Sequence, residues 1–170
     1  MKKRGLNLPK AREITAPASL LKRFASYFID FFIINIIIIG PFKKIVEHIL
    51  PKDASASELY SYMQQSNEAN VIIAAISVII GILAVSYFTY FEYRTQQTPG
   101  KMLMKNFIVP EKGKKLTFWN YLLSNLTFVP FFPFILLWII DPIHMFISQK
   151  NQRFMEKIAN IVVMEKYKVI

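Results

Sequence analysis

The residues from 71 to 91, VIIAAISVIIGILAVSYFTYF, restrict the possible fold of this chain more than any other segment. They include no charged residue, and at about 1.5 Å per residue they are long enough to cross the roughly 30 Å of bilayer hydrocarbon. Such a run is typical of a transmembrane helix. Small residues recur at helical spacing within it, at Ala74, Ser77, Gly81 and Ala84. They predict that another helix approaches closely along this side.

A second apolar run covers residues 20–39 and contains a carboxylate, Asp30, near its middle. Gly40 and Pro41 predict the end of this helix. An ionised carboxylate at the bilayer centre costs about 2.5 to 3.5 kcal/mol on insertion scales, so Asp30 must face the protein interior and have a polar partner or take up a proton. Arg23 lies two helical turns earlier on the same face. Its long side chain can reach the membrane interface from that helix end.

The third apolar segment, 116–147, is interrupted by Pro130 and Pro133, which argue against one continuous helix. We expect a helical hairpin broken between these prolines and either shallow and tilted or re-entrant. Each arm of about 14 residues would reach only about 21 Å, too little for a full crossing. A single third span is the alternative.

The distribution of basic residues predicts the orientation in the membrane. The 170-residue chain has a net charge of +10, and its Lys and Arg flank the apolar runs, gathering in 1–23, 91–119 and 141–170 but not in 41–70. The positive-inside rule then places the N-terminus, the segment after the second span and the C-terminus in the cytoplasm. We expect a multi-pass protein of the cell (plasma) membrane whose charge reflects this orientation. Nucleic-acid binding is not expected, because no basic stripe with interleaved aromatic residues is present.

Short strand patterns lie outside the apolar runs. MLMKNFIV (102–109) alternates as a strand does, KLTF (115–118) could return as a second strand after the turn at PEKGKK, and NIVVMEKYKV (160–169) could supply a third. The predicted fold class is therefore an all-α membrane protein. It is a small bundle of two full transmembrane helices and a Pro-broken helical hairpin, with a small cytoplasmic β element.

Two sequence blocks resemble the RDD family of membrane proteins, which is named for one Arg and two Asp. LLKRFASYFIDFFI is similar to the start of the family's first helix, with Arg23 and Asp30 in the places of its Arg and first Asp. TPGKMLMKNFIV resembles a second block, a T-P-G-K turn followed by an apolar strand. The resemblance therefore marks these motif residues: Thr98, Pro99, Gly100 and Lys101.

A third block, FMEKIANIVV, is similar in place and pattern to the family's last motif, but Glu156 stands where that motif has its Asp. The family's second Asp therefore corresponds either to Asp141, just upstream, or to the substituted Glu156. The resemblance implies a membrane domain over 18–170, preceded by a basic cytoplasmic segment over 1–17. It also implies a role in transport of unidentified ligands, with cation/proton exchange among the suggestions.

Other chemistry has little support in the sequence. No Cys is present, and His48 and His144 are the only soft ligands, so we expect no metal site. Gly100-Lys101 lacks the first glycine and the Ser or Thr of a phosphate-binding loop, so no nucleotide cofactor is expected. No nucleophile and base pattern indicates an enzyme. Four other basic residues are expected either to meet lipid headgroups or to pair with Glu92 and Glu156: Lys101, Lys105, Arg153 and Lys157.

Two functional hypotheses remain from the sequence. In the first, the protein transports a small ligand or exchanges cations for protons at Asp30, with a basic partner such as Arg23, Arg94 or Arg153. Two spans can hardly enclose a pathway, so this hypothesis requires a homo-oligomer or a larger membrane partner. In the second, the protein is a scaffold or assembly subunit in the lipid bilayer that docks another membrane protein.

Overall fold

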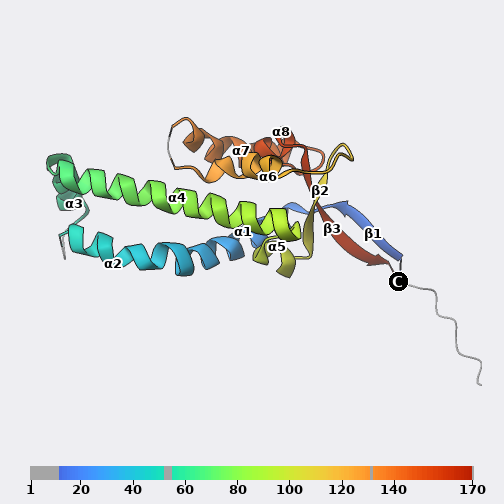
Figure 1. Cartoon of the computed structure of the whole chain (residues 1–170), viewed down its shortest axis with the longest axis horizontal. Helices are drawn as coiled ribbons and strands as arrows, with labels where there is room; N and C mark the ends of the chain where they lie inside the picture. Colours follow the sequence, from blue (N-terminus) through green and yellow to red (C-terminus); the bar gives the residue numbers. More distant parts are fainter. Residues whose placement is uncertain (1–11, 52–54, 131, 170) are drawn as a thin grey trace, which may run out of the picture.

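The structure is a computed structural model that describes residues 12–51, 55–130 and 132–169. Two long helical segments lie side by side along the molecule (Figure 1). The first begins with α1 (Leu20–Ile34), passes through a π-helical turn, η1 (Asn35–Ile39), and continues as α2 (Gly40–Ile49). The second is α4 (Asn67–Thr95), which α3 (Ala56–Gln65) precedes.

The prediction that Gly40 and Pro41 end the first helix is wrong, because the helix continues to Ile49. Pro41 occupies the first turn of α2, where the missing N–H of proline costs little. The π-helical turn that precedes Pro41 has hydrogen bonds between residues i and i+5. This wider spacing accommodates the change in the hydrogen-bond pattern of the helix.

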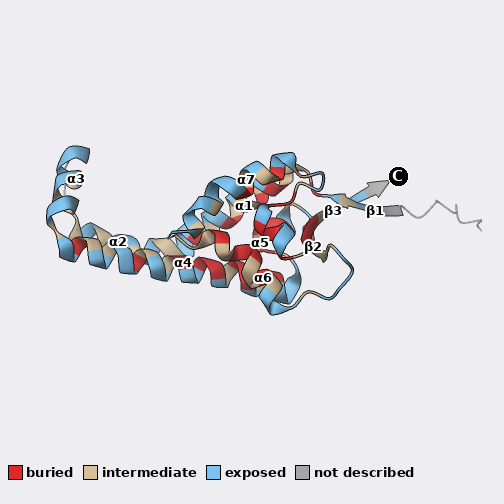
Figure 2. Ribbon diagram, turned by 90° about the horizontal axis from the view of Figure 1, so that it is seen from above, coloured by how far each residue is buried: buried red, intermediate tan, exposed pale blue. Residues whose placement is uncertain are grey.

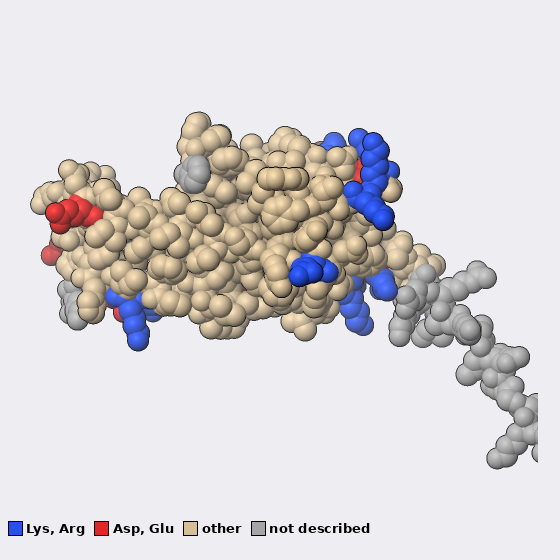
Figure 3. Space-filling model, viewed as in Figure 1, with Lys and Arg blue, Asp and Glu red and all other residues tan. Residues whose placement is uncertain are grey.

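The long helices carry most of their apolar side chains on the outside. Only 17% of the most apolar stretch in the first helix, and 28% of that in α4, is buried within the protein. The middle of the face in Figure 3 is almost free of charged side chains, whereas Lys and Arg gather toward the end with the sheet. A soluble protein would bury its most apolar helices, so these two helices indicate a membrane protein.

A small antiparallel sheet closes one end of the molecule, with the strand order β1-β3-β2. Its strands are β1 (Arg12–Pro17), β2 (Asn106–Pro110) and β3 (Ile161–Val169). Ile14 pairs with Tyr167, and Ile108 pairs with Val163. The sheet therefore joins the beginning of the described chain to its end.

The strand predictions had three different outcomes. The strand near the C-terminus is confirmed as β3. The strand predicted over 102–109 is confirmed only from residue 106, since residues 99–103 form the short helix α5 (Pro99–Leu103). The strand predicted over 115–118 is wrong, because Thr117 caps the next helix together with Asn120. Strand β1 was not predicted.

The third apolar segment is a broken hairpin, as its prolines predict. α6 (Phe118–Asn125) and the 3₁₀ turn η2 (Leu126–Phe128) form the first arm, and η3 (Phe134–Leu136) with α7 (Leu137–Ile147) forms the second. The indole Nε1 of Trp138 donates to the Thr127 carbonyl at 2.6 Å and so ties the arms together. α6 packs on α4, while α7 approaches α1, where the rings of Phe146 and Phe24 lie 5.9 Å apart.

Buried residues concentrate where the hairpin, the sheet and the long helices meet (Figure 2). The short helix α8 (Phe154–Ile158) lies at this junction and contacts both α6 and α7. One apolar cluster joins the sheet to α6 through Ile108, Val163 and Tyr121. A second joins α1 to α4 through Ile34 and Phe88, and the Phe88 ring stacks on Phe128 of the hairpin at 4.3 Å.

The small residues of α4 allow a close approach at two of the four predicted positions. Gly81 and Ala84 are buried, Ser77 is half-buried and Ala74 is exposed. Gly81 faces the hairpin so closely that an added Cβ would lie 2.4 Å from Cδ of Pro130. The predicted close packing is thus confirmed at the two buried positions.

Replacing Gly81 with alanine should therefore push the hairpin away from α4 and lower the free energy of unfolding by about 1 to 3 kcal/mol. Thermal unfolding in detergent would measure the change. The matched control is Gly40→Ala, where the added Cβ would meet only the Asn35 carbonyl oxygen, at an ordinary 3.5 Å. Equal losses in both variants would show that Pro130 does not constrain Gly81.

Candidate functional site

The site is built around Asp30, which is completely buried in the second half of α1. Its carboxylate accepts three hydrogen bonds. The Thr98 hydroxyl donates at 2.5 Å, the Gly100 backbone N–H at 2.8 Å and the Tyr87 hydroxyl at 3.0 Å. The prediction that Asp30 faces the protein interior and has polar partners is confirmed. All three donors are uncharged, and no ion pair to Asp30 forms among the described residues.

The T-P-G-K segment reaches Asp30 because it starts a helix. Thr98 is the N-cap of α5, and its hydroxyl accepts the Lys101 N–H at 3.2 Å while donating to Asp30. Pro99 occupies the first turn, where proline is well tolerated. The predicted turn is therefore a helix cap that covers the carboxylate.

Gly100 is required by the space between α5 and α1. A Cβ on Gly100 would lie 2.1 Å from the Ser26 carbonyl oxygen and 2.8 Å from the Asp30 carboxylate. At Gly100, α5 therefore lies so close to the α1 backbone and to the Asp30 carboxylate that only glycine, which has no Cβ, fits. Because Gly100 has no side chain, its backbone N–H can reach the Asp30 carboxylate.

Lys101, the last residue of the motif, turns to the other side and pairs with Glu92 of α4. Its Nζ lies 2.5 Å from Oε1 of Glu92, and Asn125 of α6 donates to Oε2 at 2.7 Å. Burial would lower the pKa of Lys101, but the surrounding acidic groups, Glu92 first and Glu156 with it, together hold that pKa above its ordinary value. Lys101 therefore stays a cation in a closed site, and α5 is fixed to α1, α4 and α6 at once.

Arg23 is bound by the C-terminal part of the chain. Its Nη2 donates to both carboxylate oxygens of Glu156 at 2.6 Å, and the guanidinium is 1% exposed. The prediction that Arg23 reaches the membrane interface is wrong, because a carboxylate inside the protein binds it instead. Arg23 and Asp30 share a helix face but have different partners.

Glu156 and Asp141 lie on either side of a second guanidinium, that of Arg153. Nε of Arg153 donates to Glu156 at 3.0 Å, and its Nη1 lies 3.9 Å from Oδ2 of Asp141. Asp141 also accepts the Thr127 hydroxyl at 2.6 Å and the Met155 N–H at 3.0 Å. The two candidates for the family's second Asp therefore contact the same arginine.

Electrostatics explain why these groups are charged despite their burial. Burial would raise the pKa of Glu156, but Arg23 and Arg153 outweigh it and hold that pKa well below its ordinary value. Burial likewise would lower the pKa of Arg153, but the carboxylates of Glu156 and Asp141 help to hold it above its ordinary value. The Tyr27 ring lies 5.1 Å from the Arg153 guanidinium, and its hydroxyl donates to Glu156 at 3.2 Å.

Asp30 and the ion-paired carboxylates thus form two neighbouring sites. We call six residues the buried charge network: Arg23, Glu92, Lys101, Asp141, Arg153 and Glu156. Lys101 joins this network to Asp30, since the adjacent Gly100 binds that carboxylate. The proposed pairing of Lys101 and Arg153 with Glu92 and Glu156 is confirmed, whereas Lys105 and Lys157 are exposed.

Three polar side chains that contribute to the site were not predicted from the sequence. Tyr87 belongs to a row of tyrosines at the end of α4, yet its hydroxyl turns inward to Asp30. Asn125 lies in an apolar segment, where a buried amide needs a partner, and this could have marked it. Thr127 is similarly placed, and its hydroxyl binds Asp141.

Comparisons with known proteins agree with the motifs. Neither a curated protein nor a solved structure matches the chain. The model of the RDD family matches residues 17–160, which is most of the chain and includes Arg23, Asp30, the T-P-G-K segment, Asp141 and Glu156. The chain therefore belongs to the RDD family.

Proposed function

We propose that the protein transports a small ligand or exchanges cations for protons across the cell membrane, with Asp30 as the carboxylate that takes up and releases the proton or cation. The observation that carries this proposal is that Asp30 is bound by uncharged donors only, with no cation in direct contact among the described residues. A carboxylate within a membrane helix is costly unless it is paired or protonated. Asp30 has three hydrogen-bond donors but no cation in contact, so it is the carboxyl of this site that can change its charge most readily.

The balance of buried charges supports the proposal. Three buried cations, Arg23, Lys101 and Arg153, face four buried carboxyl groups, which are Asp30 and the three of the buried charge network. Each cation forms an ion pair with a network carboxylate. If all seven groups were ionised, the site would have one negative charge in excess. A proton or a bound cation at Asp30 removes that excess.

In the proposed topology, the sheet end and both ends of the chain are cytoplasmic, and residues 41–70 are outside. Lys22 and Lys43 mark the two ends of the apolar part of the first helix, at about 12 Å and about 20 Å along the helix from Asp30. The hairpin enters from the cytoplasmic side and returns, because α6 is only about 12 Å long. We propose no enzymatic reaction. A homo-oligomer or a larger membrane partner completes the pathway, since two long helices enclose little space.

Ion exchange in liposomes tests the proposal. The protein is reconstituted with a pH-sensitive dye inside, a sodium or potassium gradient is imposed, and proton movement is recorded. We expect flux from the wild type and from the control Glu58→Gln, an exposed carboxylate of α3. We expect only background flux from Asp30→Asn, whose folding is checked by thermal unfolding in detergent.

Two outcomes would contradict this function. Full flux from folded Asp30→Asn would show that another group exchanges the proton. No flux from any of the three folded proteins would favour the alternative, in which Asp30 fixes the packing of a membrane scaffold that docks another membrane protein. Chemical crosslinking in native membranes tests the oligomer, and we expect a band larger than the monomer.

A further inference from the structure

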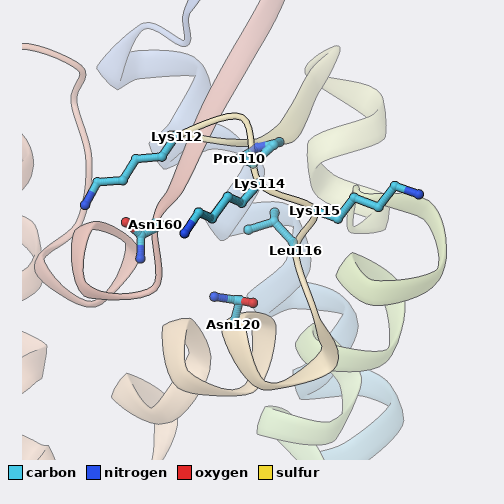
Figure 4. A pocket seen from close by; sticks show the side chains of 7 residues that line it. All are labelled: Pro110, Lys112, Lys114, Lys115, Leu116, Asn120 and Asn160. Atoms are coloured by element: carbon cyan, nitrogen blue, oxygen red, sulfur yellow. The ribbon is translucent and has the colours of Figure 1, made fainter.

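A pocket with three lysines lies on the loop between β2 and α6, away from Asp30 (Figure 4). Its volume is about 300 Å³, and we call it the loop pocket. It is lined by Pro110, Lys112, Lys114, Lys115, Leu116, Asn120 and Asn160. None of these lining residues is acidic. A cavity of this size accommodates a small polar group such as a phosphate with part of its substituent.

The walls of the loop pocket are held in place by one backbone hydrogen bond and one donated by the side-chain amide of Asn120, both to backbone carbonyls of the turn before β3. The Glu111 N–H donates to the Asn160 carbonyl at 2.9 Å, which joins the end of β2 to the turn before β3. The Asn120 amide donates to the Ala159 carbonyl at 3.0 Å, which joins α6 to the same turn. Gly113 has a φ of 69°, a conformation that glycine adopts without strain, and it reverses the loop between Lys112 and Lys114.

Three lysines and no acidic residue line the loop pocket, so its lining has a positive charge. Figure 4 shows the side chains of Lys112 and Lys114 extending to the same side, toward Asn160, while Lys115 points away. The neighbouring acid, Glu111, binds Lys150 at 2.8 Å. That hydrogen bond is the leading cause that lowers the pKa of Glu111, and the charge of Lys112 contributes as well. Two lysines thus extend to one side of the loop pocket, and the lining contains no carboxylate.

The loop pocket is also next to apolar surface. Phe118 and Trp119 begin α6 directly after the loop, and 43% and 72% of their surfaces are exposed. Ile158 on α8, close to Asn160 in sequence, is 47% exposed. Exposed aromatic rings beside lysines are typical of the level at which lipid headgroups meet acyl chains. This surrounding suits a phosphate that carries acyl chains better than a free phosphate ion.

We propose that the loop pocket binds the phosphate of an anionic phospholipid headgroup, with Lys112 and Lys114 as the contacting groups. Ammonium groups near a membrane surface attract anionic lipid headgroups. The bound lipid would place its acyl chains against Trp119 and hold the sheet end of the protein against the membrane. This proposal does not depend on ion exchange at Asp30.

Quenching of Trp119 fluorescence by brominated lipid tests the proposal. A Trp138→Phe background leaves Trp119 as the single tryptophan. The protein is reconstituted in phosphatidylcholine bilayers with a small fraction of brominated phosphatidylglycerol, or of brominated phosphatidylcholine as reference. We expect preferential quenching by phosphatidylglycerol, and a fall of about five-fold or more in relative affinity for Lys112→Gln/Lys114→Gln.

The matched control is Lys105→Gln/Lys157→Gln, which removes the same charge from exposed positions outside the lining of the loop pocket. We expect this control to keep the preference. An equal loss in both double variants would mean attraction by net charge alone and would overturn the site. So would an unchanged preference in Lys112→Gln/Lys114→Gln. Loss of the preference on adding inorganic phosphate, but not chloride at equal ionic strength, would overturn the lipid assignment in favour of free phosphate.

Discussion

Glu156→Gln should lower the free energy of unfolding by about 3 to 5 kcal/mol, the cost of leaving buried charges without their partner. Arg23 and Arg153 both donate to this carboxylate, and both guanidinium groups are buried. A glutamine side chain keeps the size but not the charge. Chemical or thermal unfolding in detergent would measure the loss, which should show as a large drop in midpoint.

The control for this variant is Glu111→Gln, which removes a carboxylate from the more exposed pair with Lys150. Surface pairs contribute about 0.2 to 1 kcal/mol, so this change should be small. If Glu156→Gln costs no more than Glu111→Gln, the two arginines find other partners and the buried charge network is not needed for stability.

The effect of Glu156 should also depend on pH. Its pKa in the folded protein lies below the ordinary value of 4.5. Its stabilisation is therefore complete above that ordinary value and is lost as the pH falls toward the folded pKa. The difference in stability between the wild type and Glu156→Gln should be full at about pH 7 and smaller at about pH 3. A difference independent of pH would mean that packing, not charge, accounts for the loss.

Gly100→Ala should separate α5 from α1 and cost about 3 kcal/mol or more. The added Cβ would lie 2.1 Å from the Ser26 carbonyl oxygen, a backbone atom inside α1 that cannot rotate away. Overpacking alone costs about 1 to 3 kcal/mol. Movement of α5 would also remove the Gly100 and Thr98 hydrogen bonds to Asp30, each worth about 1.5 to 3 kcal/mol because the acceptor can be charged. Limited proteolysis and thermal unfolding in detergent would detect the loosened segment.

Gly113→Ala separates steric from conformational effects. Gly113 has open space around its Cβ position but a positive φ, so alanine there should cost about 1 kcal/mol from backbone strain alone. A loss at Gly100 no greater than that at Gly113 would contradict the close approach of α5 to α1.

The two long helices were predictable because their sequence determines them locally. The run 71–91 lies inside α4, since no charge or proline interrupts it. The first helix was predicted to stop too early, because Gly40 and Pro41 usually end helices and nothing local indicates a π-helical turn. In the same way, KLTF alternates like a strand, but the cap formed by Thr117 and Asn120 directs its end into a helix.

The site was only partly predictable because its contacts are distant in sequence. The burial of Asp30 follows from the cost of a carboxylate in a membrane. Its donors Thr98 and Gly100 lie 68 and 70 positions away, and the family motif marked these residues without predicting that they bind Asp30. The position of the Arg23 side chain was predicted wrongly. In a helix considered alone, the membrane interface is the only polar environment that this side chain can reach. Its actual partner, Glu156, is on another helix 133 positions later.

The separation of Arg23 from Glu156 also matters while the protein is being made. Ribosomes add roughly 5 to 20 residues per second, so roughly 10 s pass between synthesis of the guanidinium and synthesis of its carboxylate. During that time Arg23 must keep water or lipid phosphate as its partner, and the first helix cannot take its final position. A chain that terminates before residue 156 never obtains this carboxylate, and we expect membrane quality control to remove it rapidly.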